Sequence, residues 1–323
     1  MLSDEKFAHA LKNMARYNPG LLDSTLHHGE PTILSGTKTT VRTHYVLSDA
    51  NGNVRLSQLA EVLADQIIFF CIPRSDIKRL SDLPEHQRIA ASSRLYRRAK
   101  ETFAQAQPMT GEGSELLLFT LLENVLEVPQ LMTKMSLKTS ENVHVHGADA
   151  VHAVLEEESG NLALYWGEAK MYADVGDALS ACFKSLEPFL RMDWEVIRRD
   201  QWLVMHYLDT ADEEVKLRLL RFFDQDNTES VKVEARGACV IGFDHKNYPK
   251  LPHDIVAIQE KIEANLASWI KKINRRLNSR KLQEIAIEIF LVPVPSAQEF
   301  RNAIMTTLDI PIPEIQPKKA TNA

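Results

Sequence analysis

Cysteine is scarce in this chain, and its placement argues against folds held together by disulfide bonds or by cysteine-rich zinc sites. The 323 residues include three cysteines, Cys71, Cys182 and Cys239, which lie far apart within apolar sequence. An odd number without Cys-x-x-Cys spacing favours neither a disulfide framework nor a cysteine-rich zinc site. We therefore expect three reduced thiols in a hydrophobic core.

Long apolar runs are also missing. No stretch stays apolar for the roughly 20 residues that a membrane-spanning helix requires. The first residues are polar and charged, unlike a secretory signal peptide. A composition of 44% hydrophobic and 25% charged residues is typical of a globular protein with room for a real core. The sequence thus predicts a cytoplasmic protein.

Three motifs of nucleotide and acyl chemistry are absent. The chain has no Walker-type phosphate loop, no glycine-rich dinucleotide fingerprint and no serine-nucleophile elbow. We therefore expect no nucleotide cofactor on this chain.

Positive charge is in short supply overall but concentrated in one segment. The net charge is −6, whereas contacts from lysine and arginine to phosphates supply most non-specific affinity for DNA. Residues 261–281 carry +6, which leaves −12 for the remainder. In the helix expected there, Lys271, Lys272 and Arg275 lie away from the apolar stripe. This surface either contacts DNA or a partner, or is an ordinary solvated face.

A predicted β-hairpin brings acidic and basic residues together. Residues Asp149–Glu156 and Asn161–Lys170 have strand patterns on either side of a polar turn. With the turn centred on Ser159-Gly160, Asp149 faces Lys170 and Val151 faces Glu168. Glu168 is then the diagonal neighbour of Asp149, roughly 7 Å away, on the same face of the sheet.

The chemistry of phosphodiester hydrolysis explains why such residues would gather. The reaction uses an oxygen-ligated cation, Mg²⁺ or Mn²⁺, to polarise the phosphate and lower the pKa of the attacking water. Asp149 and Glu168 could hold this cation together with the backbone carbonyl of Ala169. Lys170 could orient or deprotonate the water and offset negative charge in the transition state.

A third carboxylate precedes the hairpin in the chain. Residues 114–128 are apolar on nearly all sides, which predicts a buried helix of about four turns. Glu115 lies on the face of Leu118 and Leu122, and a buried carboxylate needs a partner such as a metal or its water. A favourable position at the helix N-terminus is the alternative explanation.

This order of elements resembles the core of the PD-(D/E)xK nuclease superfamily. The resemblance rests on a helix with Glu115, a strand with Asp149, a strand with Glu168-x-Lys170 and a helix over 177–190. The runs GSELLLFTLLE, HGADAVHAVLEE and YWGEAKMY are more narrowly similar to HamA, the family of nuclease subunits of the Hachiman anti-phage defence system. Ala148 stands where the superfamily has its proline.

The resemblance implies a fold, an activity and a partner. It implies a restriction-endonuclease-like mixed sheet flanked by helices, joined here to an α/β N-terminal region. It also implies a metal-dependent deoxyribonuclease with catalytic residues Glu115, Asp149, Glu168 and Lys170, controlled by a superfamily 2 helicase, HamB. The competing interpretation is an inactive nuclease-like scaffold that binds a helicase or DNA.

The Asp/Glu-x-Lys pattern is weak by itself, because it occurs five times in this chain. Asp244-His245-Lys246 is the strongest rival, since it ends a buried-strand pattern, yet it lacks a hairpin partner with an aspartate. An ordinary cross-strand salt bridge is the structural alternative for the hairpin residues themselves. Lys138 and Lys184 are weaker candidates for contacts with phosphate.

The chain is expected to divide into three parts. Residues 1–106 would form the N-terminal α/β region, 107–310 the nuclease core with a C-terminal elaboration, and 311–323 a flexible, proline-containing tail. Alternating patterns after residue 190, including a strand near Trp202–Leu208, predict a mixed sheet covered by helices.

Overall fold

The structure of the 323-residue chain is a computed structural model that describes residues 2–105, 111–135, 148–191, 202, 204–210, 212–246, 248 and 257–312. Lys138, most of the strand expected at 135–139 and the tail from residue 313 onward lie outside these described residues.

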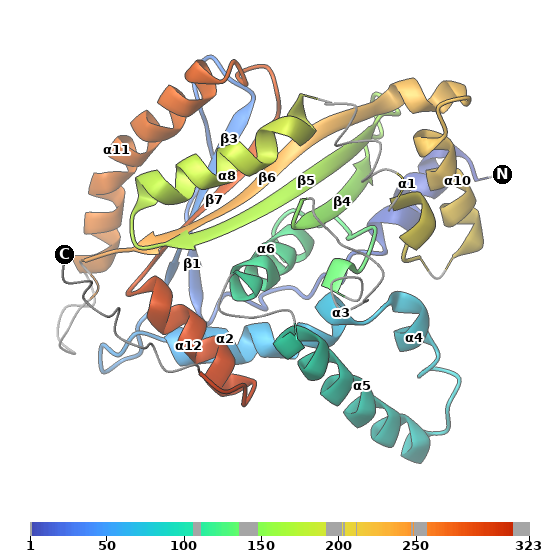
Figure 1. Ribbon diagram of the computed structural model, residues 1–323, viewed down its shortest axis with the longest axis horizontal. Coiled ribbons are helices and arrows are strands. Elements are labelled where there is room, and N and C mark those ends of the chain that lie inside the picture. The colour runs from blue at the N-terminus through green and yellow to red at the C-terminus, as the bar shows by residue number, and fades with distance from the viewer. Residues whose placement is uncertain are drawn as a thin grey trace, which may run out of the picture.

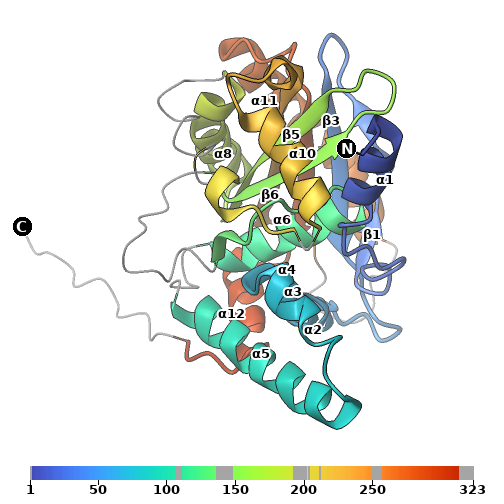
Figure 2. The ribbon, with the colours of Figure 1, turned by 90° about the vertical axis from the view of Figure 1, so that its right-hand side faces the viewer.

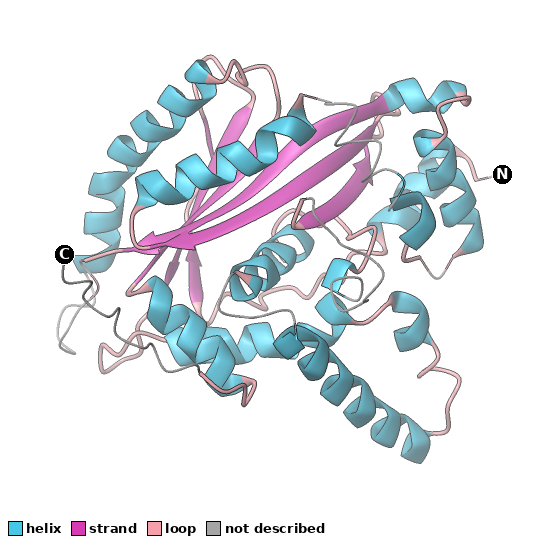
Figure 3. Ribbon diagram, in the orientation of Figure 1, coloured by secondary structure: helices cyan, strands magenta, loops and turns pink. Residues whose placement is uncertain are grey.

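One mixed sheet forms the centre of the fold (Figures 1 and 3). Four neighbouring strands run parallel, in the order β3 (Thr39–Val46), β7 (Ile287–Val294), β6 (Val233–Asp244) and β5 (Leu162–Tyr172). The antiparallel strands are β1 (Leu26–His28) and β2 (Thr32–Ile33), which pair with β3, and β4 (Ala150–Leu155), which pairs with β5. The parallel strands are buried on both faces, because helices connect them and cover the sheet.

Helices fill the connections between the strands. In chain order they are α1 (Asp4–Lys12), α2 (Leu56–Asp65), α3 (Ile67–Cys71), α4 (Arg74–Lys78), α5 (Glu85–Gln105), α6 (Glu112–Asn124), α8 (Val175–Leu190), α10 (Glu213–Phe223), the 3₁₀ helix η1 (Thr228–Lys232), α11 (Ala257–Ser279) and α12 (Ala297–Thr307). Several begin at a side-chain cap, as where the carboxylate of Asp174 accepts from the backbone amides of Gly176 and Asp177 at the start of α8. Helix α5 projects away from the sheet (Figure 2). Among the described residues, none of the helices is long and apolar enough to cross a membrane.

Helices α8 and α6 cover opposite faces of the sheet at β5. The ring of Trp166 packs on Phe189 of α8, with 5.0 Å between the ring centroids. The next residue, Gly167, faces the other way, where a Cβ would lie 3.0 Å from Leu118 of α6. Because successive strand residues project to opposite faces, Glu168 shares the α8 face with Trp166.

Most of the expected elements are present, but the strand expected near Trp202–Leu208 is wrong. Residues 204–207 are helical, and the side chains of Val204 and Leu208 are buried. That spacing of four residues is the period of one helix face. Trp202, at the start of the expected strand, is 50% exposed.

The N-terminal region contributes directly to the central sheet. Strand β3 pairs in parallel with β7, near the end of the chain, and one continuous hydrophobic core includes residues from both regions. The division expected near residue 107 therefore does not separate two sheets, and it stays a prediction.

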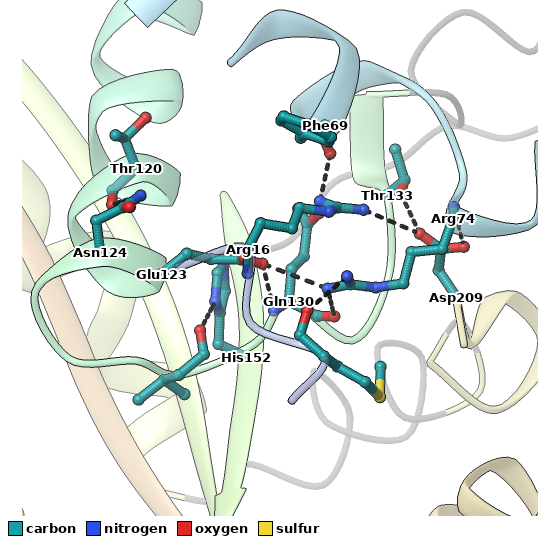
Figure 4. Close-up of polar contacts among 12 residues, drawn as sticks. Arg16, Phe69, Arg74, Thr120, Glu123, Asn124, Gln130, Thr133, His152 and Asp209 are labelled. Carbon is teal, nitrogen blue, oxygen red and sulfur yellow. Dashed lines mark hydrogen bonds and ion pairs between the residues drawn. The ribbon is translucent and has the colours of Figure 1, made fainter. Parts of the chain in front are cut away.

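A buried charge network holds four segments together beside the sheet (Figure 4). Its charged members are Arg16 after α1, Arg74 at the start of α4, Glu123 in α6 and Asp209 before α10. Glu123 is fully buried and accepts from the backbone amide of Arg16 and from Arg74, whose Nη2 is 3.3 Å from its Oε1. Asp209 accepts from the backbone amide of Arg74 at 2.6 Å. The network thus places two positively charged side chains beside two negatively charged ones.

Burial has the largest effect on the pKa of Arg16 in this network. Together with the nearby charge of Arg74, burial lowers the pKa of Arg16 to about 10, so the side chain remains a cation at neutral pH. Its Nη2 lies 3.9 Å from Oδ2 of Asp209. Removal of one partner would leave a buried charge without compensation.

We expect Arg74→Met to destabilise the fold by about 3–5 kcal/mol, because it leaves Glu123 and Asp209 with less positive charge in a buried place. Arg79→Met is the matched control, since the side chain of Arg79 is 76% exposed in its pair with Asp76 and should contribute about 0–1 kcal/mol. Urea unfolding measures both changes. Equal losses would show that the network adds nothing beyond a surface pair.

Gly167 offers a second test of the packing. A Cβ at this position would lie 2.7 Å from Cβ of Ala150 on β4, so Gly167→Ala should cost about 1–3 kcal/mol through overpacking. At Gly113 in α6 the nearest atom would be 3.5 Å away, and Gly113→Ala should stabilise the helix by about 0.5–1 kcal/mol. Opposite signs in urea unfolding are the expected result. A loss at Gly113 as large as that at Gly167 would contradict this packing.

Candidate active site

The hairpin of β4 and β5 brings Asp149 close to Glu168. The ladder pairs Ala150 with Gly167 and Val151 with Trp166, and the backbone amide of Asp149, just before β4, donates to Gly167 O at 2.8 Å. The register expected from the sequence, with Val151 facing Glu168, is therefore wrong by two residues. Glu168 and Lys170 share one face of β5, as expected, because they lie two residues apart on the strand. The charge of Asp149 raises the pKa of Glu168, so the two carboxyl groups lie near each other.

The length of the turn explains the corrected register. The loop comprises four residues, 157–160, where the sequence suggested two. It is closed by a bond from Glu156 N to Asn161 O at 2.9 Å and one from Gly160 N to Glu156 O at 2.8 Å. Gly160 has a φ of +67°, a left-handed conformation that glycine adopts without strain. The longer loop shifts the pairing of the two strands by two residues from the expected register.

Asp149 is fixed at the edge of the sheet where β4 begins. Its Oδ2 accepts from the backbone amide of Ala169 at 3.0 Å. In a strand, the N–H and C=O of one residue point to the same side, so the carbonyl of Ala169 also points toward Asp149. Two carboxylates and one carbonyl oxygen therefore converge at this edge.

Glu168 is a buried carboxyl with an unusual pKa. Its side chain is only 4% exposed, and burial together with the charge of Asp149 raises the pKa of Glu168 to about 7. The positive charges of Lys170 and Lys134 act in the opposite direction. The carboxyl is thus poised near its midpoint of ionisation at neutral pH.

Lys170 bonds to Glu168 through its ammonium group. Burial alone would lower the pKa of Lys170, but the carboxylates of Glu168 and Asp149 raise it above the ordinary value. In this arrangement Lys170 is a cation. It fits the expected role of offsetting negative charge better than that of a base.

Glu115 comes from the helix that covers the other face of β5 at Gly167. Glu115 lies in the first turn of α6 and is 8% exposed. Helix α6 contacts β5 at Gly167, on the face opposite to that of Glu168. The charges that most strongly influence the pKa of Glu168 are those of Asp149, Lys170 and Lys134. A role for Glu115 in the site stays a prediction.

Lys134 is a site residue that the sequence analysis missed. It is 4% exposed, and its Nζ donates to the backbone carbonyl of Ala148, next to Asp149. No local pattern marks it, because it joins the site through a segment that pairs with β4 from outside the hairpin: Leu131 N donates to Val151 O at 2.9 Å.

The rival Asp/Glu-x-Lys sequences have other roles. Asp244 accepts from the backbone amide of Ala297 at 2.6 Å and so caps the start of α12. Asp76 lies in the short helix α4 and pairs with Arg98 at 2.7 Å. Glu214 and Lys216 lie in α10, where residues two apart do not face each other. Of the described sequences of this kind, the one at Glu168 has an aspartate on its paired strand.

Of the basic residues expected to contact DNA, the four that the structure describes lie on helices α8 and α11. Lys184 on α8 and Lys271 and Arg275 on α11 are exposed, and Lys272 is partly buried. Helix α11 is held against α8 by Arg276, whose Nη2 donates to Gly176 O at 2.6 Å and to Ser180 Oγ at 2.7 Å. The basic side chains thus border the helix that follows β5, and no contact with DNA is tested by this placement.

The donor set suits a hard divalent cation. Two carboxylates and a carbonyl at one sheet edge are the oxygen ligands that Mg²⁺ and Mn²⁺ use, with water in the remaining positions. Within the part of the chain that the structure describes, no group of three or more histidine, cysteine, aspartate or glutamate side chains is arranged to hold a metal. Among the described groups, Asp149, Glu168 and the carbonyl of Ala169 are the oxygen donors that this placement offers to a metal.

A pocket lies elsewhere on the molecule, away from the carboxylate pair. A pocket of about 650 Å³ is bordered by Arg16, Phe69, Arg74 and the start of α10. It adjoins the buried charge network and includes neither Asp149 nor Glu168. We assign the chemistry to the sheet edge, because the carboxylate pair and the lysines meet there.

Fold and site together define an α/β protein whose curled mixed sheet, flanked by helices, carries a carboxylate–lysine cluster at one edge. The family model described as HamA matches residues 21–308, nearly the whole chain. The chain belongs to the HamA family, and this membership makes it a component of a Hachiman defence system. No curated protein matches the chain.

The raised pKa of Glu168 predicts how stability varies with pH. The folded pKa of about 7 exceeds the ordinary 4.5, so the protonated carboxyl favours folding, and this contribution is lost as pH rises from about 4.5 through 7. In the presence of a chelator, the free energy of unfolding of Glu168→Gln should therefore increase relative to that of the wild type by about 1–3 kcal/mol as the pH rises from 5 to 8.

Urea unfolding at the two pH values measures this difference. Glu158→Gln, an exposed carboxyl in the loop of the same hairpin, is the matched control. A difference between Glu168→Gln and the wild type that stays constant with pH would contradict the assignment.

Proposed function

We propose that this chain is a metal-dependent deoxyribonuclease with little sequence preference, the effector of a Hachiman defence complex. The fold would then be a variant of the PD-(D/E)xK nuclease core. The observation that carries the proposal is the proximity of the Asp149 and Glu168 carboxyl groups, with the amide of Ala169 bonded to Asp149 and Lys170 bonded to Glu168.

Asp149, Glu168 and the carbonyl of Ala169 would hold Mg²⁺ or Mn²⁺, and Glu115 is the further candidate ligand. The bound cation would polarise the phosphate and lower the pKa of the attacking water. The amide of Ala169 keeps Asp149 oriented toward the edge, and the buried setting strengthens every electrostatic contact.

Lys170 would stabilise the negative charge that develops on the phosphate. Its ammonium sits on a flexible stem, and its side chain is 22% exposed, so it can exchange Glu168 for a phosphate oxygen. The raised pKa keeps the charge on Lys170 while the exchange takes place.

DNA would be delivered with the help of a partner, for which the superfamily 2 helicase HamB is the candidate. The net charge of −6 gives the chain no general attraction for DNA. The basic side chains of α11 and Lys184 of α8 would guide the backbone locally.

Cleavage assays on the chain combined with its helicase, DNA, ATP and Mg²⁺ or Mn²⁺ test this function. Glu168→Ala and Lys170→Ala should each reduce the cleavage rate by roughly a hundredfold or more, because each removes a charge needed in the transition state. Glu214→Ala and Lys216→Ala are matched controls, since they alter the same sequence pattern on helix α10 and should cleave like the wild type.

Cleavage that survives both changes in the hairpin would refute the site. The inactive-scaffold alternative predicts no cleavage by any form of the protein, with helicase and DNA binding unchanged by the four substitutions.

A further inference from the structure

Lys134 places a second buried ammonium beside the carboxylate pair. Its side chain is 4% exposed, and its Nζ donates to the carbonyl of Ala148, the residue before Asp149. Its charge also acts on Glu168, where it favours the ionised carboxylate. A lysine charge in such a place is costly unless opposite charges compensate for it, and the pair supplies them.

The segment that carries Lys134 is held on both sides. Toward the sheet, it pairs with β4 through Leu131 N to Val151 O at 2.9 Å and Ala153 N to Pro129 O at 3.1 Å. Away from the sheet, Thr133 donates to Asp209 at 2.7 Å.

The buried charge network anchors this segment further. Asp209 N donates to Leu131 O at 2.8 Å. The amide of Gln130 donates to Glu123 at 3.0 Å (Figure 4). The position of Lys134 therefore depends on the network as well as on the hairpin.

Among the described residues, two ammonium groups, those of Lys134 and Lys170, already lie beside the carboxyl groups of Asp149 and Glu168. A divalent cation between the carboxyl groups would bring two further positive charges into a largely buried place. Loading of a metal is thus opposed by both lysines.

The two lysines differ in how easily they can leave. The side chain of Lys170 is partly exposed, and its ammonium bonds to Glu168 at the end of a flexible stem, so the ammonium can swing aside. Lys134 is buried and belongs to a segment tied to β4 and to Asp209. Repulsion from Lys134 would end only if that segment moves.

We propose that Lys134 is an internal counter-ion that lowers the affinity of the Asp149–Glu168 pair for a divalent cation, so that metal loading is coupled to the position of residues 129–134. This inference rests on the proposed metal site.

Binding of Mn²⁺ to the purified full-length chain, followed by the electron paramagnetic resonance signal of free Mn²⁺, tests the inference without cleavage. Lys134→Gln removes the charge but retains an amide that can donate to Ala148 O. It should bind Mn²⁺ at least about tenfold more tightly than the wild type. Lys134→Arg keeps the charge and should bind within about threefold of the wild type.

Two further variants make the result decisive. Thr133→Val keeps Lys134 and loosens its segment, so it should tighten binding in the same direction, and it serves if Lys134→Gln does not fold. Lys232→Gln, which removes an exposed lysine of η1, should leave the affinity unchanged.

Affinity that is unchanged or weaker in Lys134→Gln overturns the inference. Glu168→Ala separates this outcome from failure of the site itself. If Glu168→Ala does not weaken Mn²⁺ binding, the metal site is wrong, whereas loss of binding in Glu168→Ala with no gain in Lys134→Gln overturns only the role of Lys134.

Discussion

The close approach of two buried carboxylates is the constraint on which the rest of the site depends. Asp149 and Glu168 lie close together at the end of the β4–β5 hairpin, and like charges in a buried place are unfavourable unless something positive lies between or beside them. Lys170, Lys134 and the amide of Ala169 meet this need in the described residues. Burial, first of all, and the charge of Asp149 raise the pKa of Glu168, and a divalent cation would favour the ionised form of this carboxyl.

The fold supports this arrangement from both faces of the sheet. Trp166 and Gly167, the two residues before Glu168, seat β5 between α8 and α6, so the strand cannot shift its register without disturbing both layers. Beyond β4, the buried charge network connects α1, α4 and α6 to the segment that carries Lys134. A change in that network would therefore reach the carboxylates through the backbone.

Sequence reasoning recovered the local parts of this picture more fully than the long-range ones. Alternation placed Glu168 and Lys170 on one face, and the apolar run from residue 114 predicted the buried helix α6, because both signals lie within a few neighbouring residues. The register was wrong because a two-residue and a four-residue turn around Gly160 read alike in sequence. Lys134 was missed because the pairing of its segment with β4 brings distant residues together, and no local pattern records such pairing. The place of Glu115 in the site stays a prediction.

The central claim is that the carboxylates of Asp149 and Glu168 form a cation site. Anomalous diffraction from crystals soaked in Mn²⁺ tests this claim most directly. The account predicts one strong peak within coordination distance, about 2.2 Å, of carboxylate oxygens of both Asp149 and Glu168, with the ammonium of Lys170 no longer bonded to Glu168. A peak elsewhere, or none while Lys170 stays on Glu168 at saturating Mn²⁺, would contradict it.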